Sequence, residues 1–285
     1  MKPAAFRYHA PKTLDEAVAM LAEVAADDGR ILAGGQSLVP IMAFRLARPS
    51  HLVDINGITA LAELKTADNK LSIGACVRHA AFYQPVVEGP LGKLLTTVVH
   101  HIGHHPIRTR GTFCGSVAHA DPASEWCLVT ATLNAEIVAS SKRGTRIIAA
   151  KDFFAGIMTT ALGEDELLTE VRLPLLAADT RFGFQEFARR AGDFALSMAL
   201  VTYRLNDKTM IEPRVGVGAA EATPRRILEA EAALAGKVPG PEAFRAAAEA
   251  AAAAIDPLED HNTNADYRRD LVRALTRRAL ERAAA

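Results

Sequence analysis

Two short segments of the chain combine glycines with hydroxyl side chains, a composition that suits binding of phosphate by main-chain amides. The first is Ala33-Gly34-Gly35-Gln36-Ser37-Leu38, and the second, much further along the chain, is Gly111-Thr112-Phe113-Cys114-Gly115-Ser116. Glycine permits a positive φ and a close approach to the backbone, and successive N–H groups in such a turn form an anion-binding nest. Two turns of this kind can hold the two phosphates of one pyrophosphate.

Neither segment is a complete nucleotide-binding fingerprint. The first lacks both the G-x-G-x-x-G pattern and the lysine of a P-loop, so a simple strand-to-helix turn remains an alternative. Arg108 and Arg110 precede the second segment and either add positive charge or are merely solvated. Asp121 and Glu125 either accept hydrogen bonds from ribose or ribityl hydroxyls or lie at a helix start, since Asp121-Pro122 would cap a helix.

The bulk composition excludes several function classes. Lysine plus arginine and aspartate plus glutamate both number 33 in 285 residues, so the charge balance gives no support for binding nucleic acid or a membrane surface. No apolar run approaches the roughly 20 residues of a membrane span. Cys76, Cys114 and Cys127 are widely spaced, which argues against a disulfide framework or an iron–sulfur ligand set and favours a cytoplasmic location.

Four histidines also have a spacing that can bind metal, but no acidic third ligand lies beside them. These are His100, His101, His104 and His105. We therefore predict no metal site in this chain.

Hydrophobic spacing predicts the elements that must position the two segments. Thr13 and Glu16 form a capping box before a helical run. Residues 1–55 predict a small α/β lobe with parallel pairing, residues 56–175 a mainly antiparallel lobe, and residues 176–285 a third domain with a helix starting at Thr223-Pro224. The expected strands are 30–33, 51–55, 70–74, 136–140, 146–149, 168–173, 182–188, 195–205 and 214–219, and the expected helices are 14–25, 38–46, 91–102, 241–255 and 265–284.

Taken together, the segments resemble the FAD-binding medium subunit of the molybdenum hydroxylase family, which includes the medium chains of xanthine dehydrogenase and carbon monoxide dehydrogenase. The matching motifs are AGGQS at 33–37, IRTRGTFCGS at 107–116 and AHADP at 118–122. The start KPAAFRYHAPKTLDEAVAML, TALGEDELLTEVRLP at 160–174 and FARRAGDFAL at 187–196 are also similar, so the resemblance covers essentially the whole chain. The family usually has glycine where Cys114 stands, and a thiol there would narrow the approach to phosphate.

The resemblance implies an α+β fold, with a two-lobed FAD-binding domain of the vanillyl-alcohol-oxidase type and a C-terminal domain of small antiparallel sheet and helices. FAD would lie between the first two lobes, with its pyrophosphate held by residues 33–38 and 112–116. Asp121 and Glu125 would face the ribityl and ribose region. Leu162 would pack on the isoalloxazine and Phe194 would lie beside it, although core packing is an alternative for both.

The resemblance also implies the function. The chain would carry electrons from two [2Fe–2S] clusters on a small partner subunit, through FAD, to a terminal acceptor. A large partner subunit would hold the molybdopterin cofactor and hydroxylate an N-heteroaromatic, purine or aldehyde, in a heterotrimer or a dimer of it. No catalytic acid or base is expected in this chain. The alternatives are a carbon monoxide dehydrogenase medium subunit, a self-sufficient FAD oxidoreductase of the same fold, and a non-catalytic anion-binding module.

Overall fold

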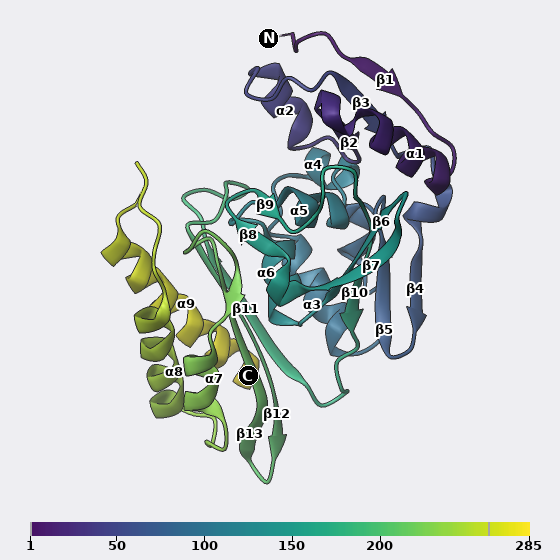
Figure 1. Ribbon diagram of the computed structural model, residues 1–285. Coiled ribbons are helices and arrows are strands. Elements are labelled where there is room, and N and C mark those ends of the chain that lie inside the picture. Colours follow the sequence, from purple (N-terminus) through teal and green to yellow (C-terminus); the bar gives the residue numbers. More distant parts are fainter. Residues whose placement is uncertain (1, 262) are drawn as a thin grey trace.

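The chain begins with a three-stranded parallel sheet that two helices flank (Figure 1). The computed structural model describes residues 2–261 and 263–285. The strand order is β1-β3-β2, and the sequence predicted β2 and β3 but not β1. Thr13 caps the first helix as expected, but the Glu16 carboxylate accepts from the N–H of Lys12 rather than from that of Thr13. The elements are β1 (Arg7–His9), α1 (Leu14–Val24), β2 (Gly29–Leu32), α2 (Leu38–Ala43) and β3 (His51–Asp54).

A five-stranded antiparallel sheet follows, with the order β4-β5-β10-β6-β7. Two of the helices around it, α4 and α5, were not predicted, because glycine and proline interrupt the helical spacing between residues 103 and 122. Its strands are β4 (Leu64–Ala67), β5 (Lys70–Gly74), β6 (Glu136–Ser141), β7 (Gly144–Ala149) and β10 (Leu167–Pro174). Strands β8 (Phe154–Gly156) and β9 (Thr159–Thr160) pair as a separate two-stranded sheet. The helices are α3 (Pro90–Val99), α4 (His105–Arg110), α5 (Phe113–His119) and α6 (Glu125–Thr132).

The last part of the chain is a four-stranded antiparallel sheet, with helices α7, α8 and α9 on the face away from the rest of the molecule (Figure 1). The elements are β11 (Arg181–Phe187), β12 (Ser197–Asn206), β13 (Thr209–Gly218), β14 (Arg225–Arg226), α7 (Leu228–Leu234), α8 (Pro241–Ala254) and α9 (Ala265–Ala284). Parallel and antiparallel sheets thus occupy separate parts of the chain, which makes the fold α+β. Among the described residues, no helix has the length and apolar character needed to cross a membrane.

Two expected helix starts are wrong. Thr223-Pro224 does not open a helix, because the next two residues pair with β13 as strand β14 and α7 begins only at Leu228. Asp121-Pro122, the alternative helix cap, does not cap α6 either, although Glu125 does lie in the first turn of that helix. The cap is Ser124, whose hydroxyl accepts from the N–H of Cys127 at 3.3 Å.

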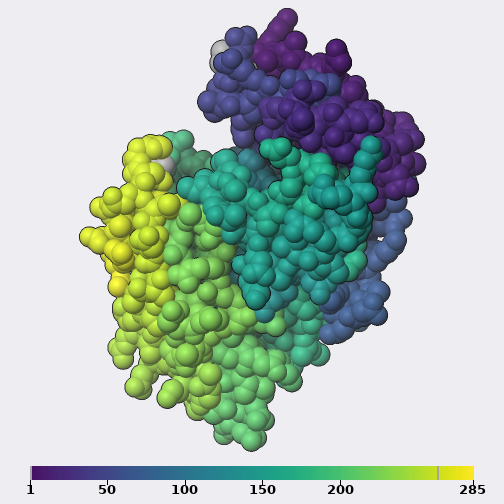
Figure 2. All heavy atoms as spheres, viewed as in Figure 1, coloured from purple at the N-terminus to yellow at the C-terminus, as the bar shows by residue number. Residues whose placement is uncertain are grey.

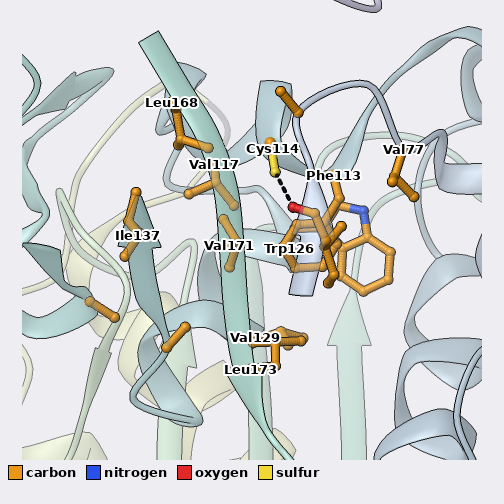
Figure 3. Close-up of a cluster of buried hydrophobic side chains, with 14 of the residues drawn as sticks. Val77, Phe113, Cys114, Val117, Trp126, Val129, Ile137, Leu168, Val171 and Leu173 are labelled. Atoms are coloured by element: carbon orange, nitrogen blue, oxygen red, sulfur yellow. Dashed lines mark hydrogen bonds between the residues drawn. The ribbon is translucent and has the colours of Figure 1, made fainter. Parts of the chain in front are cut away.

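The third sheet is covered on both faces, which ties the C-terminal part to the rest of the molecule. Along β12, Met198 and Leu200 belong to the core of the first two sheets, while Ala199, Val201 and Tyr203 belong to a second core that the C-terminal helices share, with α9 packed on the strand. This alternation follows from the two-residue period of a strand. In the first core, Phe113, Val117, Trp126, Ile137 and Val171 belong to one buried cluster (Figure 3). The sheet that carries the C-terminal helices therefore also forms one wall of the core beneath the two glycine segments.

Candidate functional site

A cavity of about 680 Å³ opens between the N-terminal lobe, the second lobe and a loop before β12. In the space-filling view a hollow separates the N-terminal lobe, in purple, from the C-terminal part, in green and yellow (Figure 2). Its volume is in the range of cofactor-binding cavities, roughly 300–1,000 Å³. The lining includes residues 33–38, Thr112, Gly115, Ser116, Asp121, Glu125 and Phe194.

A second cavity, of about 360 Å³, lies on the other side of the same turns. Its walls include Leu21 and Ile55 of the N-terminal lobe and Cys114 and Leu162 of the second lobe. The two cavities share the lining residues Arg30, Ile31, Ala33, Gly115, Ala118 and Met158. An elongated ligand crossing the glycine segments would therefore have one end in each cavity.

The two glycine segments touch. A methyl group on Gly34 would lie 2.5 Å from the carbonyl oxygen of Arg110 and 2.6 Å from the Cα of Gly111. On Gly115 it would lie 3.7 Å from the Cβ of Ala33. Only glycine fits at position 34, because any side chain there would push the segments apart.

A hydrogen-bonded clip of side chains that the sequence did not single out also joins the segments. Asn56 donates from Nδ2 to the carbonyl of Ala33 at 2.7 Å, and its Oδ1 accepts from Arg78 at 2.5 Å. The same guanidinium donates to the carbonyl of Arg110. Arg78 therefore fixes the spacing between the first segment and the residues that lead into the second. The signal in the sequence was weak, since a lone asparagine and a lone arginine form no recognisable motif.

The first segment leaves its main-chain donors free. Within the described parts of the chain, no hydrogen bond uses the N–H groups of residues 34–37. Gly35 has a φ of +73°, and Ser37 precedes α2 without a side-chain cap. Consecutive unpaired N–H groups facing a cavity form a nest for an anion.

The second segment uses most of its donors internally. Thr112 caps α5 by accepting from the N–H of Gly115 at 3.0 Å, and its carbonyl accepts from Ser116. The N–H of Phe113 donates to Val77. The ring of Phe113 is fully buried, borders neither cavity, and lies 4.7 Å from the ring of Trp126. The main-chain donors of this segment are therefore less available than the sequence suggested.

Cys114 points into the core rather than toward the first segment. Its thiol donates to the carbonyl of Ile73 at 3.2 Å, drawn as a dashed line in Figure 3. Burial raises the pKa of this thiol well above its usual value. A cysteine in place of the family's glycine thus fits as a small core residue.

The acidic residues form a buried cluster that reaches the third sheet. Glu125 lines the larger cavity, and its pKa is raised to about 7, mainly by burial and then by the charge of Asp121. Glu186 of β11 has its pKa raised to about 9 by burial and by Glu125. Its Oε2 has no hydrogen-bond partner among the described residues and lies 3.8 Å from Nδ1 of His101. Reasoning from the sequence missed Glu186, because the cluster forms only when β11 packs against α3.

Leu162 and Phe194 are not brought together. Leu162 borders the smaller cavity, whereas Phe194 is 73% exposed at the larger one. The turn before Phe194 packs closely on the second lobe. Gly192 lies so near the ring of His104 that an added methyl group would be 2.2 Å from its Cε1. The two residues thus border different cavities, and the expectation that both contact one ring stays a prediction.

Arg108 does not point at the glycine segments. Its guanidinium donates to the carbonyls of Ile102 and Gly103 at 2.9 and 3.1 Å and to the hydroxyl of Tyr83 at 2.8 Å. These bonds order the loop between α3 and α4, which forms part of the larger cavity's wall. The role of this arginine is thus structural.

Comparison with known proteins agrees with this geometry. Residues 4–176 match the family model of the FAD binding domain in molybdopterin dehydrogenase, and residues 182–283 match that of the CO dehydrogenase flavoprotein C-terminal domain. The chain is 37% identical to the nicotine 6-hydroxylase medium subunit of Paenarthrobacter nicotinovorans, covering 100% of this chain and 99% of the relative. It is also 37% identical to caffeine dehydrogenase subunit beta of Pseudomonas sp. strain CBB1, covering 100% and 96%.

A solved structure shows the same fold. Carbon monoxide dehydrogenase from Hydrogenophaga pseudoflava superimposes with a TM-score of 0.95 at 36% identity, over 100% of this chain and 99% of the matched chain. The two touching glycine segments, the flanking cavities and the C-terminal sheet with its helices all lie within matched regions. The chain therefore belongs to the family of molybdopterin dehydrogenase FAD-binding proteins that carry the CO dehydrogenase flavoprotein C-terminal domain.

Proposed function

We propose that this chain is the FAD-carrying electron-transfer subunit of a molybdenum-dependent hydroxylase. The observation that carries the proposal is the contact between the two glycine segments, with one cavity on either side. FAD, when bound, accepts electrons from one partner and passes them to another. The task of the protein is then to hold the cofactor and to present its redox-active ring.

The residues present fit a dinucleotide. The free N–H groups of residues 34–37 supply donors for the pyrophosphate, and Gly34 lets the two segments approach without a side chain between them. Thr112 and Ser116 contribute mainly by holding the second segment in its folded conformation. Asp121 and Glu125, on the wall of the larger cavity, are placed to accept from sugar or ribityl hydroxyls.

We assign the two ring systems to the two cavities from the exposed position of Phe194. An electron-transfer ring needs an edge that a partner can reach, and exposed Phe194 stands at the larger cavity. We therefore assign the isoalloxazine to that cavity and the adenine to the smaller one, which Leu162 borders. Leu162 then contacts the adenine, in place of the flavin contact that the sequence suggested.

The domain limits, partners and substrate complete the proposal. We propose an FAD-binding domain at 1–175, with lobes 1–55 and 56–175, and a C-terminal domain at 176–285. A large molybdopterin subunit and a small subunit with two [2Fe–2S] clusters would complete a heterotrimer or its dimer. The names of two relatives, which concern nicotine and caffeine, favour an N-heteroaromatic substrate, and the three buried free thiols favour a reducing, cytoplasmic setting. A carbon monoxide dehydrogenase is the second candidate, on the likeness to that structure.

Purification of the native complex tests this proposal. We expect about one FAD for each copy of this chain, together with molybdenum and iron, and reduction of an artificial acceptor when an N-heteroaromatic is added. Carbon monoxide serves as the competing substrate. The isolated chain with FAD should show no turnover with either compound. A chain that stays colourless with excess FAD, or one that oxidises substrate without partners, would overturn the proposal.

A further inference from the structure

His79 lies on the wall of the larger cavity, beside the second glycine segment. It begins the short 3-10 helix His79–Tyr83 and is only 5% exposed. Its main-chain N–H donates to the carbonyl of Gly111 at 3.0 Å, so its backbone position is tied to that segment. No motif in the sequence singles it out.

One ring nitrogen of His79 is fixed by Trp126. The indole Nε1–H donates to Nδ1 of the imidazole at 2.8 Å. Because the indole nitrogen can only donate, Nδ1 must be the unprotonated acceptor. Burial, and then the positive charges of Arg78 and Arg108, lower the pKa of His79 to about 3. At neutral pH the ring is therefore uncharged, with its single proton on Nε2.

The proton on Nε2 has no acceptor among the described residues. The Nε2–Cδ2 edge of the ring faces Gly111, where a methyl group would lie 2.5 Å from Nε2. Gly111 thus lies against this edge of the ring, and its lack of a side chain leaves room for the imidazole at the cavity wall.

We propose that His79 is a further cofactor-binding residue, whose Nε2–H donates a hydrogen bond to an oxygen or nitrogen acceptor of FAD beside the second glycine segment. Trp126 acts on FAD only through His79, by holding the tautomer. The inference rests on the proposed function. It adds a hydrogen-bond donor beside the second segment, where most main-chain N–H groups already donate within the protein. Because the donor is neutral, it contributes equally at every pH at which the protein is folded, down to about pH 4.

Titration of the full chain with FAD, followed by flavin fluorescence, tests the role of the donor. The variants are His79→Phe, which removes the donor, and His79→Gln, which keeps one. A third, Trp126→Phe, removes the indole N–H that holds the proton of His79 on Nε2. His100→Gln serves as the control, since His100 is exposed and borders neither cavity. We expect His79→Phe to weaken FAD binding about tenfold, His79→Gln to restore most of the affinity, Trp126→Phe to give an intermediate loss, and the control to change nothing.

Nitrogen-15 NMR of the wild-type chain provides a second measurement that needs no variant. Without FAD the spectrum should show a neutral His79 with its proton on Nε2, and the Nε2 signal should shift when FAD is added. A proton on Nδ1, no shift with bound FAD, or wild-type affinity in folded His79→Phe would each overturn the inference. A wild-type chain that binds no FAD at all would instead overturn the proposed function, and this inference with it.

Discussion

The two glycine segments have similar compositions but differ in how their backbone donors are used. Residues 34–37 have free N–H groups and no side-chain cap. In the second segment the N–H groups of Phe113, Gly115 and Ser116 all donate within the protein. The first segment is therefore built to receive a ligand, whereas the second is built to be rigid and to hold the first in place.

Glycine also serves a purpose at this site that is separate from donating to a ligand, namely to let parts of the protein approach one another closely. Gly34 is needed because the segments touch, and Gly111 is needed because the His79 ring lies against it. In both cases the missing side chain makes room for another part of the protein. The ligand then gains from a backbone that is already in position, which lowers the entropy lost on binding.

The largest expected effect is that of Gly34→Ala, which disrupts the contact between the two glycine segments. Its methyl group would meet the carbonyl of Arg110 at 2.5 Å, and overpacking of this kind costs roughly 1–3 kcal/mol. We expect FAD affinity to fall about a hundredfold, measured by flavin content after dialysis and by fluorescence titration. Gly240→Ala is the control, because no heavy atom lies within 4 Å of its added methyl. Equal loss in both variants would contradict the contact as the cause.

The next largest expected effect is that of pH on the stability of the folded chain, through the buried carboxyl groups near the second segment. The raised pKa values of Glu125, about 7, and Glu186, about 9, mean that the folded state keeps protons that the unfolded chain releases above about pH 4.5. Stability should therefore fall as pH rises from about 4.5 to 9.

Glu186→Gln should remove much of this loss. The amide cannot ionise, so we expect a gain on the order of 2 kcal/mol at pH 9 and little change at pH 4.5, as a buried unpaired charge is avoided. Urea denaturation across this pH range measures the effect. The variant Glu249→Gln, in the exposed ion pair with Arg273, is the control and should follow the wild-type curve within about 0.5 kcal/mol. Parallel curves for wild type and Glu186→Gln would contradict the assignment.

A matched pair of substitutions with smaller effects distinguishes the structural role of the second segment from the ligand-binding role of the first. Thr112→Ala removes the cap of α5 and should lower stability by about 1 kcal/mol. Ser37→Ala removes a hydroxyl that caps nothing, so stability should stay unchanged while FAD affinity falls severalfold. Thermal unfolding without FAD and titration with FAD distinguish the two outcomes. If Ser37→Ala destabilised the protein and Thr112→Ala did not, the assignment of roles would be reversed.

The smallest effect should come from the thiols. Cys114 is 1% exposed with a raised pKa, so a thiol reagent at pH 8 should leave it unmodified in the folded chain and react only after denaturation. Cys114→Ser should change FAD affinity less than twofold, because the side chain points into the core. Rapid labelling of the native chain at this position, seen by mass spectrometry, would show that the second segment is more open than its hydrogen bonds indicate.

Local spacing in the sequence was enough to predict many individual elements. Strand β5 (Lys70–Gly74) and helix α9 (Ala265–Ala284) begin and end at the predicted residues. The resemblance predicted the α+β fold and the family, since both depend on motifs that can be read in order along the chain. The N-caps near residues 121 and 223 were predicted wrongly. The hydroxyl of Ser124 caps the first helix instead, and long-range pairing of β13 with β14 replaces the start of the second.

Only the tertiary structure decided which groups remain free and which face one another. The bonds between Trp126 and His79 and between Arg78 and Asn56, like the burial of Glu186 near Glu125, join residues far apart in the chain. The separation of Leu162 from Phe194 into different cavities likewise depends on how three sheets pack. Periodicity records which face of an element is apolar, but a hydrogen bond depends on the position of a distant partner, and packing alone sets that position.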